Sequence, residues 1–309
     1  MLTLVHISDP HLGPLPRPSL SELLSKRILG FLSWQLRRRK IHEGPVLGVL
    51  AQDIAAVAPD HIAITGDLVN ISLPGEFVSA TAWLRRLGSP RDITVIPGNH
   101  DAYVAMSWDR SIGQWSGFMT GSRPGSDQSE LPMRSSDDFP FVRVRGEVAL
   151  VGVTTACPMP AYSAGGYIGP RQVEALAGLL DELGQRQLFR VILIHHPPHD
   201  GRRHRRKRLY DSADFRQVVA RHGAELVLHG HTHQSGLRKL PTPQGSAPVI
   251  GVPSASAKLD HGHKGHARYH IYRIERAGQS WRLDVEVRGI SPSLDRFLIE
   301  GRFSLAIPH

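Results

Sequence analysis

The sequence predicts an α/β fold, and two observations lead to that prediction. Short runs of aliphatic residues, each suited to a buried strand, alternate with helix-like segments, which implies parallel pairing with right-handed crossovers. Five of these runs end abruptly in Asp, Asn or His beside Gly or Pro. The run from Val191 to Ile194 is the clearest, because it stops at His195, His196 and two prolines, which cannot donate to a strand ladder. Open α/β sheets bind ligands at such strand ends, so a site is predicted there.

Length and composition are those of an ordinary globular protein. The chain has 309 residues, 40% hydrophobic and 21% charged, and we expect one domain spanning residues 1–309. No apolar run approaches the roughly 20 residues that span a bilayer, and the first residues lack the features of a signal peptide. The single cysteine excludes an internal disulfide and fits a reducing compartment. We therefore expect a cytoplasmic protein, with a peripheral position on the inner face of the membrane as the alternative.

The chain is strongly basic, with a formal net charge of +9. Such a balance predicts attraction to anions, which include phosphorylated metabolites, nucleic acid and acidic membrane surfaces. The 18 histidines are more informative, because many of them lie at the strand ends.

Hydrophobic periodicity gives the expected order of elements. Helices are expected at about 20–40, 45–58, 75–88, 170–183 and 211–222, and strands at 2–8, 61–65, 92–96, 189–194 and 225–228. Residues 141–153 read as two antiparallel strands joined at Gly146, and 249–287 as a series of short strands. An irregular insertion is expected at 103–139. Its Trp108, Trp115 and Phe118 should pack a small core of their own or line a substrate entrance.

A second insertion, residues 17–42, should form a basic amphipathic helix that begins at the N-cap Ser19. The apolar arc of this helix is wider than a docked helix needs. Its expected core stripe is Leu20, Leu23, Leu24, Ile28, Phe31 and Trp34, with Leu29, Leu32 and Leu36 outside the stripe. The helix ends in the basic run Arg37–Lys40. It could pack on two sides with a solvated basic end, meet lipid or a lipid-linked substrate, or contact a partner protein.

The polar residues at the strand ends form five blocks. These are Asp9-x-His11, Gly66-Asp67, Gly98-Asn99-His100-Asp101, His195-His196-Pro197 and Gly230-His231-x-His233. Residues i and i+2 of a strand point the same way, so Asp9 and His11 could address one point if extended geometry persists. The same holds for His231 and His233. Carboxylate, carboxamide and imidazole without thiolate suit Mn, Fe or Zn, and Asp67 could bridge two such ions.

This ordered series, covering roughly residues 5–235, resembles the calcineurin-like metallophosphoesterase superfamily. The resemblance implies an αββα sandwich of two mixed sheets flanked by helices, with two divalent metal ions as cofactors. One metal would be held by Asp9, His11, Asp67 and His233. The second would be held by Asp67 as the bridge together with Asn99, His195 and His231. His196 would then be a supporting or structural residue.

The resemblance also implies a mechanism. Two cations about 3.5–4 Å apart would polarise the phosphoryl oxygens and lower the pKa of a bridging water to give hydroxide. His100 would lie beside the metals without binding them, and Asp101 would orient its imidazole. His100 would protonate the departing alkoxide or stabilise the transition state.

The expected substrate is a small nucleotide or a nucleotide-linked lipid precursor, cleaved at a phosphodiester or pyrophosphate bond. The sequence is closest in pattern to bacterial phosphodiesterases and UDP-diacylglucosamine pyrophosphohydrolases, and it lacks the Asp-Arg-Gly signature of protein phosphatases after Asp67. Alternatives are a phosphomonoesterase of broad specificity, a non-catalytic metal-bound scaffold, and a membrane-surface binding module.

The partners expected from the sequence are a small phosphorylated substrate and an anionic membrane surface contacted through residues 20–40. Nucleic acid is unlikely, because no capping region is long enough to bind a duplex, and no protein partner is evident. A basic run after His195 could clamp a second phosphate or form a solvated loop. Its candidate substrate-binding residues are Arg202, Arg203, Arg205 and Arg206. His261, His263 and His266 are read as a polar loop rather than a metal site.

Overall fold

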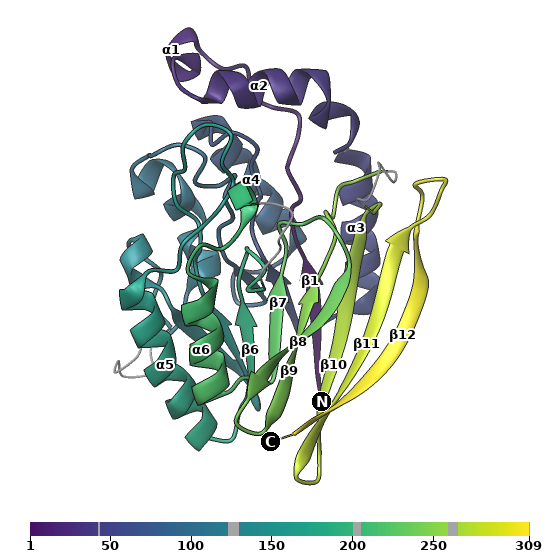
Figure 1. Ribbon diagram of the computed structural model, residues 1–309. Coiled ribbons are helices and arrows are strands. Elements are labelled where there is room, and N and C mark those ends of the chain that lie inside the picture. Colours follow the sequence, from purple (N-terminus) through teal and green to yellow (C-terminus); the bar gives the residue numbers. More distant parts are fainter. Residues whose placement is uncertain (43, 123–129, 200–204, 259–264, 309) are drawn as a thin grey trace.

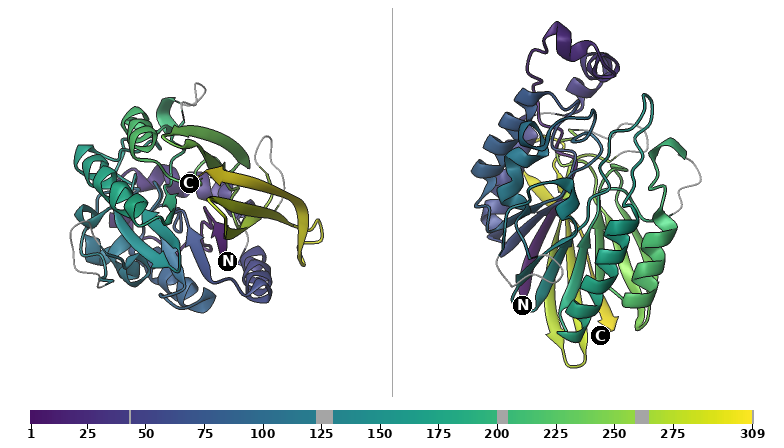
Figure 2. Two further views of the ribbon diagram at one scale, coloured as in Figure 1. Left: turned by 90° about the horizontal axis from the view of Figure 1, so that it is seen from below. Right: turned by 90° about the vertical axis from the view of Figure 1, so that its left-hand side faces the viewer.

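A computed structural model describes residues 1–309 except 43, 123–129, 200–204, 259–264 and 309. Its strands form two six-stranded sheets that pack face to face, with helices on the outer faces (Figures 1 and 2). This arrangement confirms the expected α/β sandwich of two mixed sheets flanked by helices.

The first sheet combines the N-terminal βαβ units with the C-terminal strands. Its order is β12-β11-β10-β1-β2-β3, in which β1, β2 and β3 are parallel and β10 runs antiparallel to β1. The strands are β1 (Leu2–Ile7), β2 (His61–Ile64), β3 (Ile93–Val95), β10 (Arg268–Ala277), β11 (Ser280–Ile290) and β12 (Phe297–Pro308). The prediction of short strands over 249–287 was wrong: β10 to β12 are 10 to 12 residues long and continue to Pro308.

The second sheet has the order β4-β5-β6-β7-β9-β8, with a parallel centre and antiparallel edges. Its strands are β4 (Phe141–Arg145), β5 (Val148–Gly152), β6 (Phe189–Leu193), β7 (Leu226–His229), β8 (Gly236–Thr242) and β9 (Gly245–Gly251). The expected hairpin at Gly146 is confirmed, since β4 and β5 pair antiparallel and Gly146 has a φ of +58°.

Buried β6 shows how the layers pack. Val191 and Leu193 face the core between the two sheets, whereas Ile192 and Ile194 face the core beneath the outer helices. A strand buried on both faces reads as a continuous aliphatic run, which is what the sequence shows. The helices that cover the sheets are α3 (Gly44–Val57), α4 (Pro74–Leu87), α5 (Pro170–Gln185) and α6 (Ser212–His222).

The insertion at 103–139 packs differently from its prediction. It contains the 3₁₀ helices η2 (Trp108–Arg110), η3 (Ile112–Met119) and η4 (Ser136–Asp138). Trp115 and Phe118 are buried in the main core rather than in a separate one, and the Trp115 ring lies 5.3 Å from that of Phe77 in α4. The large rings bury more area against the body of the protein than so short a segment could offer by itself.

The single helix predicted at 20–40 is three short elements, α1 (Leu20–Leu23), α2 (Arg27–Leu36) and η1 (Arg38–Lys40). The N-cap at Ser19 is confirmed, and Glu22 completes the capping box. The helix breaks after Leu23 because the start of α2 is held by the body of the protein: Arg27 donates hydrogen bonds to the carbonyls of Ile71 and Ser72. The predicted core stripe is also wrong. Leu20, Leu24 and Ile28 are exposed, whereas Gly30 is the buried residue of α2.

Figure 1 places α1 and α2 at the end of the molecule opposite the two termini. Within the described part of the chain, we find no helix of the length and apolar character required to cross a bilayer.

Candidate metal centre

The loops that follow β1, β2, β3, β6 and β7 converge at one end of the two sheets. All seven predicted ligands lie on these loops, and their polar atoms meet at one point. They are Asp9, His11, Asp67, Asn99, His195, His231 and His233. Parallel strands bring their carboxyl ends to a common edge, which explains why residues more than two hundred positions apart in the sequence come together.

The backbone at five of the seven residues is left-handed rather than extended. The φ angles are +51° at Asp9, +41° at His11, +57° at Asp67, +66° at His231 and +54° at His233. The expectation of extended geometry was therefore wrong, because tight turns direct the paired side chains to one centre. Asp and His enter this region more readily than most residues, and such conformations persist only where the surroundings fix them.

Two glycines leave room for this convergence. A Cβ on Gly98 would lie 2.6 Å from the backbone nitrogen of Asp67 and 2.7 Å from Cε1 of His195. A Cβ on Gly230 would lie 2.5 Å from Oδ2 of Asp9. The glycines in the motifs are thus required because the ligands fill the space that a side chain would need.

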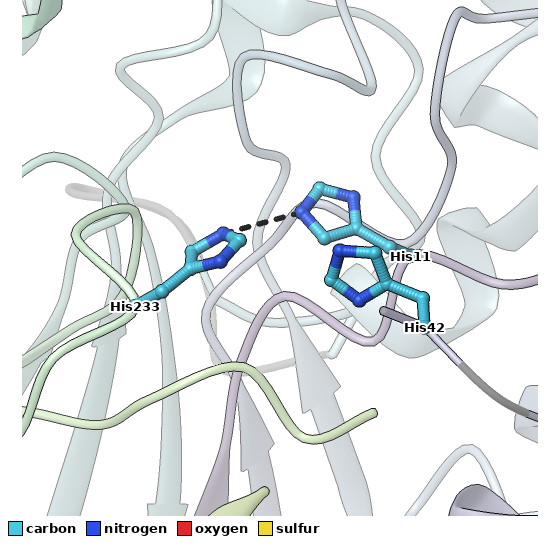
Figure 3. A group of neighbouring side chains, drawn as sticks. All are labelled: His11, His42 and His233. Carbon is cyan, nitrogen blue, oxygen red and sulfur yellow. Dashed lines mark hydrogen bonds between the residues drawn. The ribbon is translucent and has the colours of Figure 1, made fainter. Parts of the chain in front are cut away.

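The first group of ligands surrounds Asp9. Its Oδ1 lies 3.1 Å from Nε2 of His233 and 3.9 Å from Nε2 of His11, and these two ring nitrogens are 3.3 Å apart. Figure 3 shows the His11 and His233 rings facing each other. Oδ1 of Asp9 is buried, and the ring nitrogens of His233 and His11 lie around it. Such an atom fits a cation.

The second group surrounds Asn99. Its Oδ1 lies 3.2 Å from Nε2 of His195 and 2.8 Å from Nδ1 of His231. Asp67 joins the two groups, because its Oδ2 lies 3.5 Å from Nε2 of His195 and 3.9 Å from Nε2 of His11. One carboxylate oxygen therefore faces both groups, as a bridging ligand would.

Backbone carbonyls orient the histidine rings. Nδ1 of His11 lies 3.2 Å from the carbonyl of Val69, and Nδ1 of His195 lies 2.6 Å from that of Thr65. If Nδ1 donates to the carbonyl, Nε2 is left as a lone-pair donor toward the centre, which is how metal-binding histidines are usually held.

The two carboxylates of the centre favour positive charge at His195. Burial alone would lower the pKa of His195, but the neighbouring carboxylates of Asp67 and Asp9 raise it to about 9. Burial opposes ionisation of Asp9 and Asp67, yet the adjacent histidines hold the pKa of both carboxyl groups below its usual range. Two ionised carboxylates, an amide and four imidazoles form a donor set that fits a pair of divalent ions.

Asp101 has a different role from the one predicted. Its carboxylate accepts hydrogen bonds from the backbone N–H groups of Asp67 (2.8 Å), Val69 (3.0 Å) and Gly98 (2.8 Å). It therefore fixes the loops that carry the ligands and does not orient His100. Burial and the charge of Asp67 raise the pKa of Asp101 to about 7.

His100 is oriented by a backbone carbonyl instead. Its Nδ1 lies 2.5 Å from the carbonyl oxygen of Asn70, and its ring stacks on Tyr103 with centroids 5.8 Å apart. Burial and the charge of Arg38 lower the pKa of His100 to about 4. Since Nδ1 is engaged, Nε2 is the nitrogen left to meet a substrate in the cleft that His100 lines.

His196 belongs to the supporting structure, as expected. It lies beside His195 and His231 in a group that could hold a metal. Both of its ring nitrogens are engaged, however, one 2.6 Å from Oγ1 of Thr155 and the other 3.1 Å from the carbonyl of Ala164. Metal binding would break one of these buried hydrogen bonds, so we do not include His196 among the ligands.

Three cleft residues were missed by the sequence analysis: Arg38, His42 and Lys207. They help to line a cleft of about 430 Å³ above the ligands. The Arg38 guanidinium lies 3.1 Å from Nδ1 of His11 and 3.3 Å from Nδ1 of His100. The centre of the His42 ring lies 4.7 Å from that of the His11 ring. Figure 3 shows the two rings next to each other. The signal for Arg38 and His42 was that they lie between the first two motifs, whereas Lys207 belongs to the basic run after His195 that was expected to clamp a phosphate.

The predicted substrate-binding arginines are only partly described. Arg202 and Arg203 lie outside the described residues, and Arg205 is described only as backbone in η5 (Arg205–Lys207). Arg206 is exposed, and its carbonyl accepts a hydrogen bond from the Ala164 N–H group. Among the basic residues of this run that the structure describes, Lys207 lines the cleft.

Of the histidines at 261, 263 and 266, the structure describes only the last, and the other two lie outside the described residues. Nε2 of His266 lies 2.5 Å from Oε1 of Glu300 in β12, a polar contact that involves none of the predicted metal ligands.

The sequence model of the calcineurin-like phosphoesterase family matches residues 2–235. The chain belongs to this family and is a metal-dependent phosphoesterase. None of the curated proteins matches it significantly.

Two solved structures have a similar fold. A dimetal phosphatase from Danio rerio is 13% identical with a TM-score of 0.57, and the match covers 96% of this chain and 98% of the other. Purple acid phosphatase PPD1 from yellow lupin seeds is also 13% identical, with a TM-score of 0.60. That match covers 98% of this chain and 53% of the other.

Proposed function

We propose that the protein hydrolyses phosphodiester or pyrophosphate bonds in a small nucleotide or a nucleotide-linked lipid precursor. Asp9, His11 and His233 would hold one divalent ion, and Asn99, His195 and His231 the other, with Asp67 between them. When bound, the two ions supply Lewis-acid activation of the phosphorus centre and of the attacking water. The observation that supports this best is that Oδ2 of Asp67 faces His11 and His195 together.

His100 would act on the substrate directly. A bound phosphate places negative charge beside its ring and favours the imidazolium form. With Nδ1 held by the Asn70 carbonyl, the Nε2–H group would donate to a phosphoryl oxygen or to the leaving oxygen. Asp101 would contribute only by holding the ligand loops.

The preference for a diester or pyrophosphate follows from the charges in the cleft. Arg37, Arg38 and Lys207 line it in addition to the metal ligands. The scissile phosphoryl group would be bound by the metals, so these three cations are available for a second phosphate. A substrate with one phosphate would leave them without a partner.

The test is a substrate panel on protein that has been stripped with a chelator and reloaded with Mn, Fe or Zn. We expect a diester such as bis(4-nitrophenyl) phosphate, a cyclic nucleotide or UDP-diacylglucosamine to turn over at least about tenfold faster than 4-nitrophenyl phosphate. Chelation should abolish hydrolysis and metal should restore it. Faster cleavage of the monoester would instead support a phosphomonoesterase. Two bound metals without any hydrolysis would support a scaffold.

The His100→Ala variant should keep both metals and lose at least about tenfold in turnover, because it removes a proton donor and no ligand. Metal content by elemental analysis and turnover of the best substrate from the panel check this expectation. Tyr103→Leu is a matched control, since it removes the ring stacked on His100 but no group assigned to the chemistry. If His100→Ala turned over at the wild-type rate, His100 would have no part in the reaction.

A further inference from the structure

We propose that the outer face of residues 17–42 docks on an anionic lipid bilayer. This proposal concerns attachment and holds whichever phosphoester the protein cleaves. It rests on the direction in which the side chains of α1 and α2 point.

The outer face is apolar. Five large aliphatic side chains are exposed there at regular intervals of four residues: Leu20 (85%), Leu24 (87%), Ile28 (47%), Leu32 (50%) and Leu36 (71%). Single exposed leucines are normal on protein surfaces, but five large aliphatic side chains exposed between Leu20 and Leu36, over α1 and α2, mark an interaction site.

The inner side of the same segment is anchored by polar contacts, beside half-buried apolar residues such as Trp34. Lys26 donates to the carbonyl of Met159, and its ammonium lies 4.5 Å from the centre of the Tyr103 ring. Arg27 donates to the carbonyls of Ile71 (3.2 Å) and Ser72 (2.6 Å). At Gly30 the helix approaches so closely that a Cβ would lie 2.5 Å from Cγ2 of Ile71. A surface helix normally buries its apolar residues, so the exposed row indicates an apolar environment outside the protein.

Basic residues surround the apolar row. Arg17, Arg37, Arg39 and Lys40 are exposed, and residues 17–42 contain seven basic residues and one acidic residue. The acidic residue, Glu22, is hydrogen-bonded to Ser19 in the capping box. Each basic residue near an anionic membrane contributes about 1 kcal/mol of attraction, which adds to the burial of the leucines.

The charge also argues against self-association. A symmetric dimer through this face would bring the same basic residues of two chains together, and each whole chain carries a net charge of +9. An anionic bilayer neutralises this charge instead.

Docking in this way would place the catalytic cleft at the membrane. Figure 1 shows α1 and α2 at the extreme end of the molecule. The same segment contributes Ser33, Arg37, Arg38 and Ile41 to the lining of the cleft. A phosphate group displayed at the bilayer surface would therefore be within reach of the ligand loops.

The test is sedimentation of the full-length protein with vesicles of phosphatidylcholine containing about 30% phosphatidylglycerol, against vesicles of phosphatidylcholine alone. We expect binding to the anionic vesicles only, and weaker binding at higher salt. The double variant Leu24→Glu/Leu32→Glu should have a partition coefficient for anionic vesicles that is at least about tenfold lower than that of the wild type. Arg39→Gln/Lys40→Gln should lower it severalfold at low salt.

The matched control is Val78→Glu/Leu237→Glu, which places the same charges at exposed apolar positions elsewhere (60% and 47% exposed). This control should bind like the wild type. Both glutamate variants should cleave bis(4-nitrophenyl) phosphate at the wild-type rate, so a failure of docking and a failure of catalysis are distinguishable. The proposal is overturned if the wild-type protein does not bind anionic vesicles. It is also overturned if the Leu24→Glu/Leu32→Glu variant binds them as well as the Val78→Glu/Leu237→Glu control. It is also overturned if sedimentation shows a dimer that Leu24→Glu/Leu32→Glu converts to a monomer.

Discussion

Replacing Asp67 by asparagine should abolish binding of the metal pair and lower turnover about a thousandfold or more. Asp67 is the residue whose oxygen faces both ligand groups, so the change weakens both positions at once. Asparagine has nearly the same shape as aspartate, and its Oδ1 can still accept the hydrogen bond from the backbone N–H group of His100. The loss should therefore come from charge rather than from unfolding. Elemental analysis and turnover of a generic phosphodiester measure the effect.

Asp109→Asn is the matched control for this experiment, because Asp109 is an exposed carboxylate in η2. It should keep the metal content and turnover of the wild type. An Asp67→Asn variant that still bound two ions and turned over within about tenfold of the wild type would rule out the bridging role of Asp67.

Replacing Gly98 by alanine should disrupt the centre almost as severely. The new methyl group would meet the backbone nitrogen of Asp67 and Cε1 of His195, neither of which can move without displacing a ligand. We expect destabilisation of about 3 kcal/mol and loss of metal binding, because overpacking a buried site forces the backbone to shift. Denaturant unfolding and metal analysis of the variant check both effects.

Gly178→Ala provides the comparison for Gly98→Ala. Gly178 lies within α5, and a Cβ there would have no atom within 4 Å. Alanine should stabilise that helix by up to about 1 kcal/mol, because it restricts the unfolded chain. If Gly98→Ala were as stable and as well metallated as Gly178→Ala, the close packing described around Asp67 would be incorrect.

The convergence of the candidate ligands could be predicted from the sequence because each of them lies on a loop that follows a strand, whereas their assignment to two metals came from the family resemblance. Aliphatic runs fix where the strands lie, and the sheet then brings their ends together whatever the length of the intervening chain. His11 and His231 reach the common centre although their backbone is left-handed rather than extended. Residue type and position after a strand predicted a shared site, and the family resemblance supplied the ligand roles.

The cleft residues outside the motifs were not predictable in the same way. Arg38 belongs to a basic run that reads as a solvated helix end, and only tertiary packing directs one of its four basic residues to His11. The family resemblance implied that Asp101 orients the imidazole of His100. Its carboxylate instead accepts hydrogen bonds from three backbone N–H groups in two loops. A local sequence pattern does not predict such an arrangement.

The helix at 20–40 was mispredicted for a related reason. Periodicity indicates which residues share a face but not which face meets the protein. Arg27 and Gly30 are placed inward by contacts with residues about forty positions later, so the leucine row points outward. A wide apolar arc was the one sign in the sequence that this segment differs from an ordinary docked helix.

The pairing of β1 bears on how the chain acquires its site during synthesis. This strand, which leads into Asp9 and His11, lies between β2 and β10, and Leu2 is opposite Ile274. The ribosome therefore makes the first metal-binding loop long before the strand that completes its sheet. Contacts so distant in sequence slow folding. When only the five motifs have left the ribosome, β10 is still missing, and β1 has an unpaired edge next to the loop of Asp9.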